Sequence, residues 1–441
     1  MMNHLLTTEA PSAAITKELT LRILGSLAQG QELQRINVRL WDGSYWPDAH
    51  PKAATIVLNR PSALKEMLLA GTEAGVGEAY IHSAFDVEGD VEAAFEWADL
   101  IIAQTEGWSK KLKVGYQLHR LPDPEVAQNH SSRHFAHLNG QQHSLKRDRD
   151  AIRFHYDVSN DFYRLWLDPW MIYSCAYFSH RDDSLETAQI NKLDHICRKL
   201  GLKPGDRLLD IGCGWGGLLI HAATHYGIEG EGITLSENQA ELARKRIYDA
   251  GLQDQVFVRL QDYRELQEWE SYDAIVSVGM VEHVGMKKLP AYFQQVARLL
   301  KPGGLFMNHG IGLGPVPLPD QSGSFIDQYV FPDTDLLPIG QTLNLAESAH
   351  FEIRDVESLR EHYALTLRHW VRRLEERHQD ALQYVNEPVY RIWRLYMAGC
   401  AHNFQIGQLS VYQTLLAKLK PDGSSSAPLT RDDWYLLGRT P

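Results

Sequence analysis

The sequence predicts an α/β fold with a mostly parallel sheet over residues 149–441, preceded by a small α+β domain over residues 1–120. A chain of 441 residues is too long for one ordinary domain and suits two or three. Short apolar runs alternate with helical stretches between positions 184 and 309, which is typical of βαβ units. One such run, Arg207–Ile211, leads through a glycine-rich turn into an apolar helical stretch. α/β proteins hold nucleosides at turns of this kind, at the carboxyl end of a strand.

The N-terminal 120 residues alternate helical and strand patterns but contain no motif that indicates chemistry. Residues 1–15 are expected to form a loose tail. Pro61 at a first helical position and Asp90 as an N-cap support two of the helices. The expected elements are a helix at 15–27, strands at 36–41 and 53–58, a helix at 61–70, a strand at 79–85 and a helix at 90–104.

Residues 107–150 are locally basic in a chain whose formal net charge is −12. We expect a linker at 121–148, because apolar residues become sparse after Leu121. Its bases could hold the protein against anionic lipid headgroups, at about 1 kcal/mol each, or could simply belong to a solvated linker. Three histidines have a spacing compatible with metal ligands, but no cysteine or acidic pattern accompanies them, so no metal is predicted. They are His130, His134 and His137.

The pattern from residue 150 onward is strictly α/β. Ser184 and Ser236 are good N-caps for two of its helices. A Gly/Pro-rich insertion at 310–340 is expected to form a lid or a substrate wall. The expected strands are 207–211, 227–234, 255–260, 272–278, 305–309, 351–356 and 409–416, which makes seven, and the helices are 184–201, 218–223, 236–251, 288–300 and a group ending near 404.

The composition excludes several classes of protein. A net charge of −12 argues against a general nucleic-acid binder. The four cysteines are widely spaced, which predicts neither a disulfide framework nor a zinc site and fits a reducing cytoplasm. No apolar run of about 18 residues and no signal-peptide pattern are present, so we expect neither secretion nor a membrane span. The protein could still sit on a membrane.

The acidic residue before the glycine-rich turn indicates which nucleoside the turn binds. Asp210 lies at an otherwise apolar strand end, where a buried carboxylate needs a partner, and a cationic ligand would supply one. The glycines meet the NAD fingerprint only in part, and the next strand ends in Thr234-Leu235-Ser236 without the usual acid. The D-x-G-x-G-x-G loop, with Asp262 after the third strand, favours S-adenosylmethionine, whose sulfonium and amino groups are positive.

Several longer motifs resemble the cyclopropane fatty acid synthases, a family that includes the mycolic acid cyclopropane synthases. The resemblance covers residues 150–420 in the family's order and implies a Rossmann-like methyltransferase domain. The N-terminal region corresponds to the extra part of the longer bacterial enzymes and resembles sterol-carrier-like lipid modules more weakly. The motifs are His155–Tyr163, Tyr173–Phe178, Asp210–Gly217, Gly232–Gln239, Gly279–Gly285, Asn308–Ile311 and Gly399–Phe404.

The resemblance implies methyl transfer from S-adenosylmethionine to a cis double bond in a phospholipid acyl chain. Methyl addition leaves a carbocation, and loss of a proton from the added methyl group closes a cyclopropane ring. The alkene is a poor nucleophile, so the cofactor must be held in line with it. In this family a glutamine takes the role of the ribose acid. The implied cofactor residues are Tyr173, Ser174, Asp210, Gly212, Gly214, Gly216, Thr234, Leu235, Gln239, Asp262 and Tyr263.

The family also binds a bicarbonate ion, which acts as the base. The residues implied to hold it are Cys175, Glu282, His309, the backbone of Ile311, and Tyr363. Cys400 has been considered catalytic in this family, but it lies in an apolar stretch without a neighbouring cation, so we expect a packed cysteine. Aromatic residues that could line an acyl tunnel or belong to the core are Phe162, Tyr163, Trp166, Trp170, Tyr177, Phe178, Tyr329, Trp370 and Trp393.

The implied partners are unsaturated phospholipid acyl chains and an anionic membrane surface. A cytoplasmic protein at the inner membrane face is expected, with a homodimer as a candidate assembly and no nucleic acid. Three other functions stay open. Deprotonation of the cation elsewhere gives a methylene or, after reduction, a methyl-branched product. A small-molecule N-methyltransferase would need no bicarbonate, and a non-catalytic lipid-binding protein would not need the intact cofactor loop.

Overall fold

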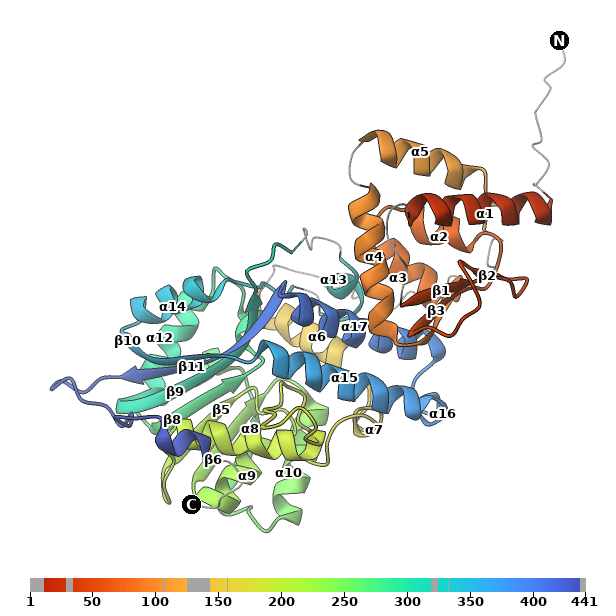
Figure 1. Ribbon diagram of the computed structural model, residues 1–441. Coiled ribbons are helices and arrows are strands. Elements are labelled where there is room, and N and C mark those ends of the chain that lie inside the picture. Colours follow the sequence, from red (N-terminus) through yellow and green to blue (C-terminus); the bar gives the residue numbers. More distant parts are fainter. Residues whose placement is uncertain are drawn as a thin grey trace. The chain divides into compact units, whose positions relative to one another are not determined.

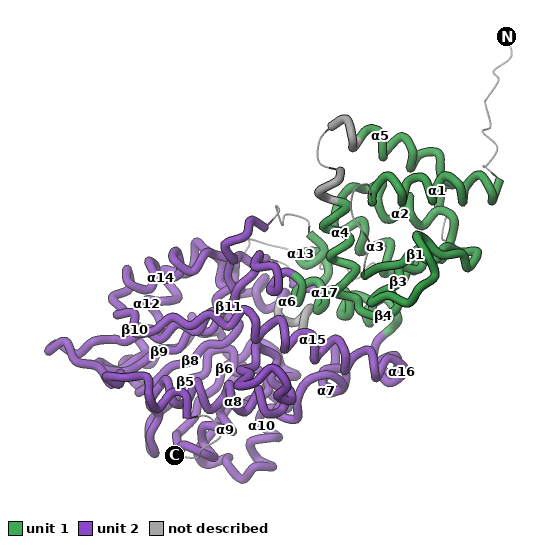
Figure 2. The backbone as a smooth tube through the Cα atoms, in the orientation of Figure 1, with its two compact units in different colours: residues 1–135, 322–329, 386–402 green, residues 136–321, 330–385, 403–441 purple. Residues whose placement is uncertain are grey.

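The chain divides into two compact units, coloured separately in Figure 2. The computed structural model describes residues 12–28, 35–105, 108–124, 143–156, 158–318, 324–331 and 333–436, with side chains described except at 102–105, 108–111 and 152–156. The first unit comprises residues 1–135, 322–329 and 386–402, and the second comprises 136–321, 330–385 and 403–441. Of the expected tail at 1–15, residues 1–11 lie outside the described residues, and the first helix already begins at Ala13. The three linker histidines and most of the linker also lie outside the described residues.

The first unit contains a four-stranded sheet in the order β2-β1-β3-β4, with helices beside it (Figure 1). β1 and β3 pair in parallel, and the other two pairs are antiparallel. All the expected elements are confirmed except one strand. The elements are β1 (Ile36–Arg39), β2 (Tyr45–Trp46), β3 (Ala54–Leu58), β4 (Phe85–Gly89), α1 (Ala13–Leu27), α2 (Ala63–Leu68), α3 (Glu73–Ile81), α4 (Val91–Thr105), α5 (Trp108–His119) and α13 (Phe325–Tyr329).

The strand expected at 79–85 is wrong. Ala79–Ile81 forms the last turn of α3, and the strand β4 begins only at Phe85. The helix is started by Thr72, whose side-chain oxygen accepts a hydrogen bond from the backbone N–H of Gly75. A short buried apolar run fits a helix end as well as a strand, so the N-cap and not the hydrophobic run decides the structure here.

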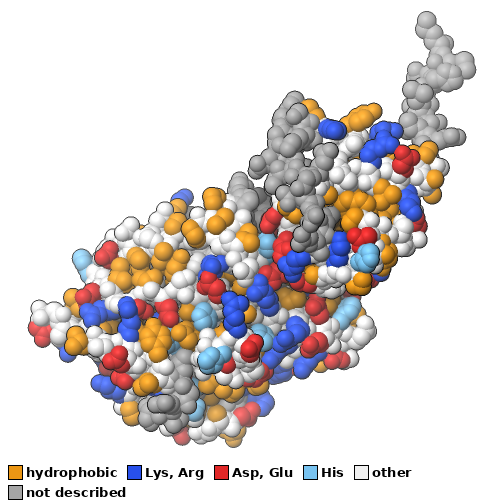
Figure 3. All heavy atoms as spheres, in the orientation of Figure 1, with side chains coloured by type: hydrophobic (Ala, Val, Ile, Leu, Met, Phe, Trp, Pro, Cys, Tyr) orange, Lys and Arg blue, Asp and Glu red, His pale blue; other side chains and the backbone are white. Residues whose placement is uncertain are grey.

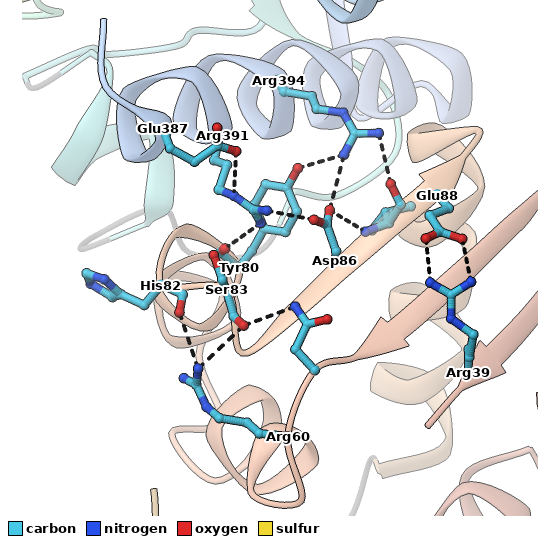
Figure 4. A network of polar contacts seen from close by, with 12 residues as sticks. Arg39, Arg60, Tyr80, His82, Ser83, Asp86, Glu88, Glu387, Arg391 and Arg394 are labelled. Atoms are coloured by element: carbon cyan, nitrogen blue, oxygen red, sulfur yellow. Dashed lines mark hydrogen bonds and ion pairs between the residues drawn. The ribbon is translucent and has the colours of Figure 1, made fainter. Parts of the chain in front are cut away.

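The sequence predicts one domain over residues 149–441, but the structure assigns part of this range to the first unit. Helix α17 (Glu387–Ile406) contributes its residues up to 402 to the first unit. Figure 4 shows two buried arginines of this helix that make the connection. Arg391 binds the Asp86 carboxylate at 2.6 Å, and Arg394 donates to the Tyr80 hydroxyl at 2.7 Å. Such contacts join segments some 300 residues apart, which local patterns do not reveal.

The second unit is built on a seven-stranded sheet in the order β10-β11-β9-β8-β5-β6-β7 (Figure 1). Only β11 runs antiparallel to its neighbours, as the expected mostly parallel sheet requires. The strand order reverses direction beside β5, where such sheets place their ligands. The strands are β5 (Arg207–Ile211), β6 (Glu229–Thr234), β7 (Val256–Leu260), β8 (Tyr272–Val278), β9 (Leu300–Leu313), β10 (Phe351–Ser358) and β11 (Leu409–Lys418).

Helices cover both faces of this sheet. Leu208 and Leu209 are neighbours in β5 but belong to two different hydrophobic clusters, one formed with α8 to α10 and the other with α12 and α14. Burial on both faces explains why the central strand β5 is buried along most of its length without alternation. The helical elements are α6 (Leu145–Tyr156), α7 (Asn160–Arg164), α8 (Leu185–Lys199), α9 (Gly217–Tyr226), α10 (Glu237–Asp249), η1 (Tyr263–Glu265), α11 (Val281–Val284), α12 (Leu289–Leu299), α14 (Ile339–Ser348), α15 (Arg360–Glu376), α16 (His378–Ala381) and η2 (Asp432–Tyr435).

Strand β9 is longer than expected. It runs from Leu300 to Leu313, so residues 310–313 belong to the sheet and the Gly/Pro-rich insertion begins after them. Pro302 and Gly303 lie within the strand, where a bulge beside Tyr272 accommodates them. Among the described helices, none is both long and apolar enough to cross a membrane. All four cysteines are free and buried.

Candidate active site

The turn after β5 builds a pocket from closely packed backbone. Gly216 caps α9 with φ at 78°, a conformation that favours glycine. A Cβ on Gly217 would lie 2.3 Å from the Ile172 side chain and 2.8 Å from the Trp170 carbonyl oxygen. The glycines therefore let the segment before α8 approach the loop. The pocket lies at the carboxyl ends of β5, β6 and β8, as expected for a nucleoside site.

The pocket brings together ten of the eleven cofactor residues implied by the resemblance. The remaining one, Gly216, lies between two residues that do line it, Trp215 and Gly217. The residues that line it are Tyr173, Ser174, Asp210, Gly212, Gly214, Thr234, Leu235, Gln239, Asp262 and Tyr263.

Gln239 is buried at the end of β6, although its place on a helix would suggest a surface residue. The N-cap Ser236 accepts a hydrogen bond from its backbone N–H, and the Thr234 hydroxyl donates to its amide oxygen at 2.7 Å. The amide is thus oriented toward the strand end that carries the ribose acid in NAD proteins. Asp262, in contrast, is already bound to the Arg264 guanidinium at 2.7 and 2.8 Å.

The Asp210 carboxylate faces the pocket without a hydrogen-bond partner among the described residues. Burial raises its pKa to about 7, and the charge of Lys192 opposes this shift. A cation in the pocket would stabilise the ionised form and lower this pKa again. The sequence predicts the same arrangement, in which a buried acid at a strand end binds a positively charged ligand.

Sequence reasoning missed the three basic residues of the pocket wall. Lys192 on α8 is buried and donates to the Ser174 hydroxyl at 2.9 Å. Arg264 bridges Asp262 to Asp148 of α6. His283 also lines the pocket, and burial lowers its pKa to about 4. A lysine on the apolar face of the 184–201 helix was a usable signal, because buried lysines are rare.

A second group of polar atoms lies at the carboxyl end of β8 and at the part of β9 that pairs with it. Glu282 on α11 is 4 % exposed, and its carboxylate accepts a hydrogen bond from the backbone N–H of Ile311. Burial raises its pKa to about 7, so both protonation states are populated at neutral pH. Its Oε2 atom has no hydrogen-bond partner among the described residues. The neighbouring residues Met280 and His283 line the cofactor pocket.

His309 on β9 is the second buried polar residue of this group. The Gln413 amide nitrogen on β11 donates to its Nδ1 at 3.3 Å. Burial holds its pKa well below the usual range, so the ring is neutral and carries its single proton on Nε2. That N–H has no acceptor among the described residues. Gln413 was not singled out from the sequence, because its place opposite His309 depends on the sheet register.

Leu359 connects three further residues that the resemblance implies to the same part of the sheet. They are Cys175, Ile311 and Tyr363. The Cys175 thiol lies 3.7 Å from the Leu359 carbonyl oxygen, and the Tyr363 backbone N–H bonds to that oxygen at 3.0 Å. Leu359 also donates its N–H to Val411, which is opposite Ile311 in the sheet. Burial raises the pKa of the Cys175 thiol far above neutral, so it is a hydrogen-bonding thiol and not a thiolate.

Cys400 is not part of this group within the second unit. It belongs to the segment 386–402 and therefore to the first unit. Burial raises the pKa of its thiol to about 12, which leaves it protonated at neutral pH. Neither its position in the first unit nor its raised pKa makes the Cys400 thiol a reactive nucleophile.

The aromatic residues named from the sequence fall into separate sets. Tyr163, Trp166, Tyr173 and Trp370 form a continuous cluster, with the Tyr173 and Trp370 ring centroids 5.2 Å apart. Tyr363 packs against Trp370, which connects this cluster to the polar group. Tyr329 and Trp393 belong to the first unit.

The decisive comparison is with protein families. Residues 143–414 match the family described as mycolic acid cyclopropane synthetase. The chain belongs to this family. A probable fatty acid methyltransferase of Pseudomonas putida is 40% identical over 403 residues, which cover 91% of this chain and 96% of that protein. The cyclopropane-fatty-acyl-phospholipid synthase of Escherichia coli K12 is 39% identical over 275 residues, covering 62% and 69% of the two chains.

A solved structure of the same family agrees. The mycolic acid cyclopropane synthase CmaA1, complexed with SAH and CTAB, has a TM-score of 0.58 and 36% identity, covering 61% of this chain and 98% of that chain. The family and the α/β methyltransferase fold inferred from the motifs are thereby confirmed. The chain is an S-adenosylmethionine-dependent methyltransferase of the cyclopropane synthase family.

Proposed function

We propose that this enzyme transfers a methylene unit from S-adenosylmethionine to the cis double bond of unsaturated phospholipid acyl chains and closes a cyclopropane ring. The observation that carries the proposal is the pair of buried atoms Glu282 Oε2 and His309 Nε2, both without partners among the described residues. An unsatisfied buried polar atom is costly, so such atoms are typical of a place where a ligand binds. Their neighbours on α11 line the cofactor pocket.

The cofactor would supply an electrophilic methyl group, and the chain's own residues would fix its position. Gln239, held by Thr234 at the end of β6, would hydrogen-bond the ribose hydroxyls. The buried Asp210 supplies the negative charge that a sulfonium or ammonium group requires. A cofactor held along the carboxyl edge of the sheet keeps its reactive carbon in one place, which a weak nucleophile such as an alkene needs.

The polar group beside the pocket fits bicarbonate, which would supply a base there. His309 offers its Nε2–H as a donor, because Gln413 occupies Nδ1. Glu282 accepts a hydrogen bond from the ion's hydroxyl when it is ionised and donates one when it is protonated. The Cys175 thiol and the Tyr363 hydroxyl are further donors by their chemistry. The backbone N–H of Ile311 is bound to Glu282 in this structure, so we propose that Ile311 acts by orienting that carboxylate.

The reaction also needs a dry site. Formation of the new C–C bond breaks the S–CH3 bond and leaves a cation on the other alkene carbon. Loss of a proton from the added methyl group then closes the ring, whereas water would trap the cation. The buried aromatic cluster around Trp370 can exclude water and steady the cation through its ring faces.

A methyl-branched or methylene product is the second candidate. The observation that favours it is the match to the probable fatty acid methyltransferase, which extends over 91% of this chain and so includes the first unit. A methylene product requires only that the cation lose its proton elsewhere, whereas a methyl-branched product also requires an external reductant for the resulting alkene. An amine methyltransferase is less compatible with the structure, because an amine substrate gives the buried Glu282 and His309 atoms no role.

For membrane contact, we propose helix α5 of the first unit. Leu112 and Tyr116 are 57 % and 68 % exposed and lie one turn apart on one face. Lys113 and Arg120 are exposed beside them. Elsewhere basic side chains are interspersed with acidic ones, as the face in Figure 3 shows, and Arg147 is paired with Asp333. An apolar face with a basic border suits the surface of an anionic membrane.

The function is tested by incubating the protein with labelled S-adenosylmethionine and vesicles of unsaturated phospholipid, followed by analysis of the fatty acid methyl esters. Gain of one CH2 with loss of the double bond supports ring closure. Gain of one CH2 with an alkene retained indicates the methylene product. Absence of label in the lipid would refute both.

A further inference from the structure

The cofactor pocket contains two buried charges of opposite sign, and neither forms an ion pair with any described residue. Lys192 is 2 % exposed and Asp210 is 3 % exposed, and both line the pocket. No hydrogen bond or ion pair joins them in the described part of the chain. Among the described residues, Lys192 donates only to the neutral Ser174 hydroxyl, at 2.9 Å, which leaves two of its three N–H donors for a ligand.

The other charged groups of the pocket wall are satisfied. Arg264 binds Asp262 at 2.7 Å and Asp148 at 2.9 Å, so these three residues form a closed network. His283 is neutral, because burial lowers its pKa to about 4. Among the described lining residues, Lys192 is therefore the cation that is available to a ligand, and Asp210 is the available anion.

The Lys192 ammonium is held in a defined place. Gln189, one turn earlier on α8, donates its amide to the Ser174 carbonyl oxygen at 3.0 Å. Asp168 accepts backbone N–H groups from Trp170 and Ile172 at 2.8 and 3.0 Å. Both sets of contacts fix the segment that presents Ser174 to Lys192. Burial lowers the Lys192 pKa to about 8, so the group is still mostly charged at pH 7.

We propose that Lys192, together with the Ser174 hydroxyl, binds the α-carboxylate of the cofactor, while Asp210 takes its α-ammonium group. An amino-acid head group carries one charge of each sign on neighbouring atoms, which is the arrangement that the pocket offers. The proposal deepens the cofactor assignment on which it rests and does not depend on ring closure. Lys192 is then a cofactor-binding residue that contacts the amino-acid end of the cofactor and not its adenosine end.

The test compares ligands that differ only at the amino-acid end, by isothermal calorimetry on the full chain. S-adenosylhomocysteine has both charged groups, and 5′-methylthioadenosine lacks the amino acid. Lys192→Met should weaken binding of S-adenosylhomocysteine by roughly 10- to 100-fold and leave 5′-methylthioadenosine within about 3-fold of the wild type. Lys192→Arg should recover part of the loss. Lys245→Met, at an exposed lysine of α10, is the matched control and should bind both like the wild type.

Equal loss for both ligands would mean that Lys192 only supports the shape of the pocket, and no loss for either would mean that it does not face the carboxylate. Each result overturns the proposal. A second measurement needs no variant: decarboxylated S-adenosylmethionine should bind the wild type roughly 10-fold or more weakly than the intact cofactor. Similar affinities would contradict the proposal. Failure of the wild type to bind any of these ligands would instead refute the cofactor assignment.

Discussion

Replacement of Glu282 by glutamine should make the protein more stable at high pH and inactive at the same time. Burial raises the Glu282 pKa from 4.5 to about 7, which means that folding opposes ionisation of this carboxyl. A pKa raised in the folded state gives stability that is present below pH 4.5 and is lost as the pH rises to about 7. At roughly 1.4 kcal/mol per pH unit, the loss is about 3 kcal/mol.

Glu282→Gln cannot ionise, so it should escape this loss. The free energy of unfolding of the variant relative to the wild type should rise by about 3 kcal/mol between pH 4.5 and pH 8. Urea denaturation in bicarbonate-free buffer measures this difference. Glu241→Gln, at an exposed residue of α10, is the matched control and should show no such rise, because its carboxylate stays hydrated when folded. A relative stability of Glu282→Gln that does not change with pH would refute the reasoning.

Three further outcomes follow from the site and the surface. His309→Ala should lower turnover by roughly 100-fold while calorimetry shows unchanged S-adenosylhomocysteine binding, and wild-type turnover would remove His309 from the site. Gln413→Glu should lower turnover more than Gln413→Leu in steady-state assays, because a carboxylate would draw the His309 proton to Nδ1 and leave Nε2 without one; equal losses would contradict the assigned tautomer. Lys113→Glu with Arg120→Glu should weaken sedimentation with anionic vesicles, and binding by the wild type should fall with salt. Salt-independent binding would contradict the α5 contact.

The cofactor loop could be predicted from the sequence because its signals are local. A buried strand, an acid at its end and a run of glycines are neighbours in the chain, and the register of the sheet is not needed to read them. The motifs around Glu282 and His309 placed these residues through a family resemblance. Without it, each would read as a residue of the ordinary core.

What the sequence did not reveal depends on contacts between distant segments. Gln413 meets His309 only because β11 pairs antiparallel with β9, 104 residues away. Arg391 connects α17 to the first unit through Asp86, so the unit boundary follows long-range ion pairs and not a linker. Lys192 stands out in the sequence as a lysine on an apolar helix face, but the group that it contacts depends on the separate segment that carries Ser174.

The central claim is that the methyl group added to the alkene loses one of its own protons and closes a ring. The most direct test is mass spectrometry of fatty acid methyl esters after incubation of the full chain with S-adenosylmethionine carrying a CD3 group and unsaturated phospholipid vesicles. The account predicts a saturated product that retains two of the three deuterium atoms in a ring CD2 group. A product that retains all three deuterium atoms, or that keeps an alkene, would contradict it.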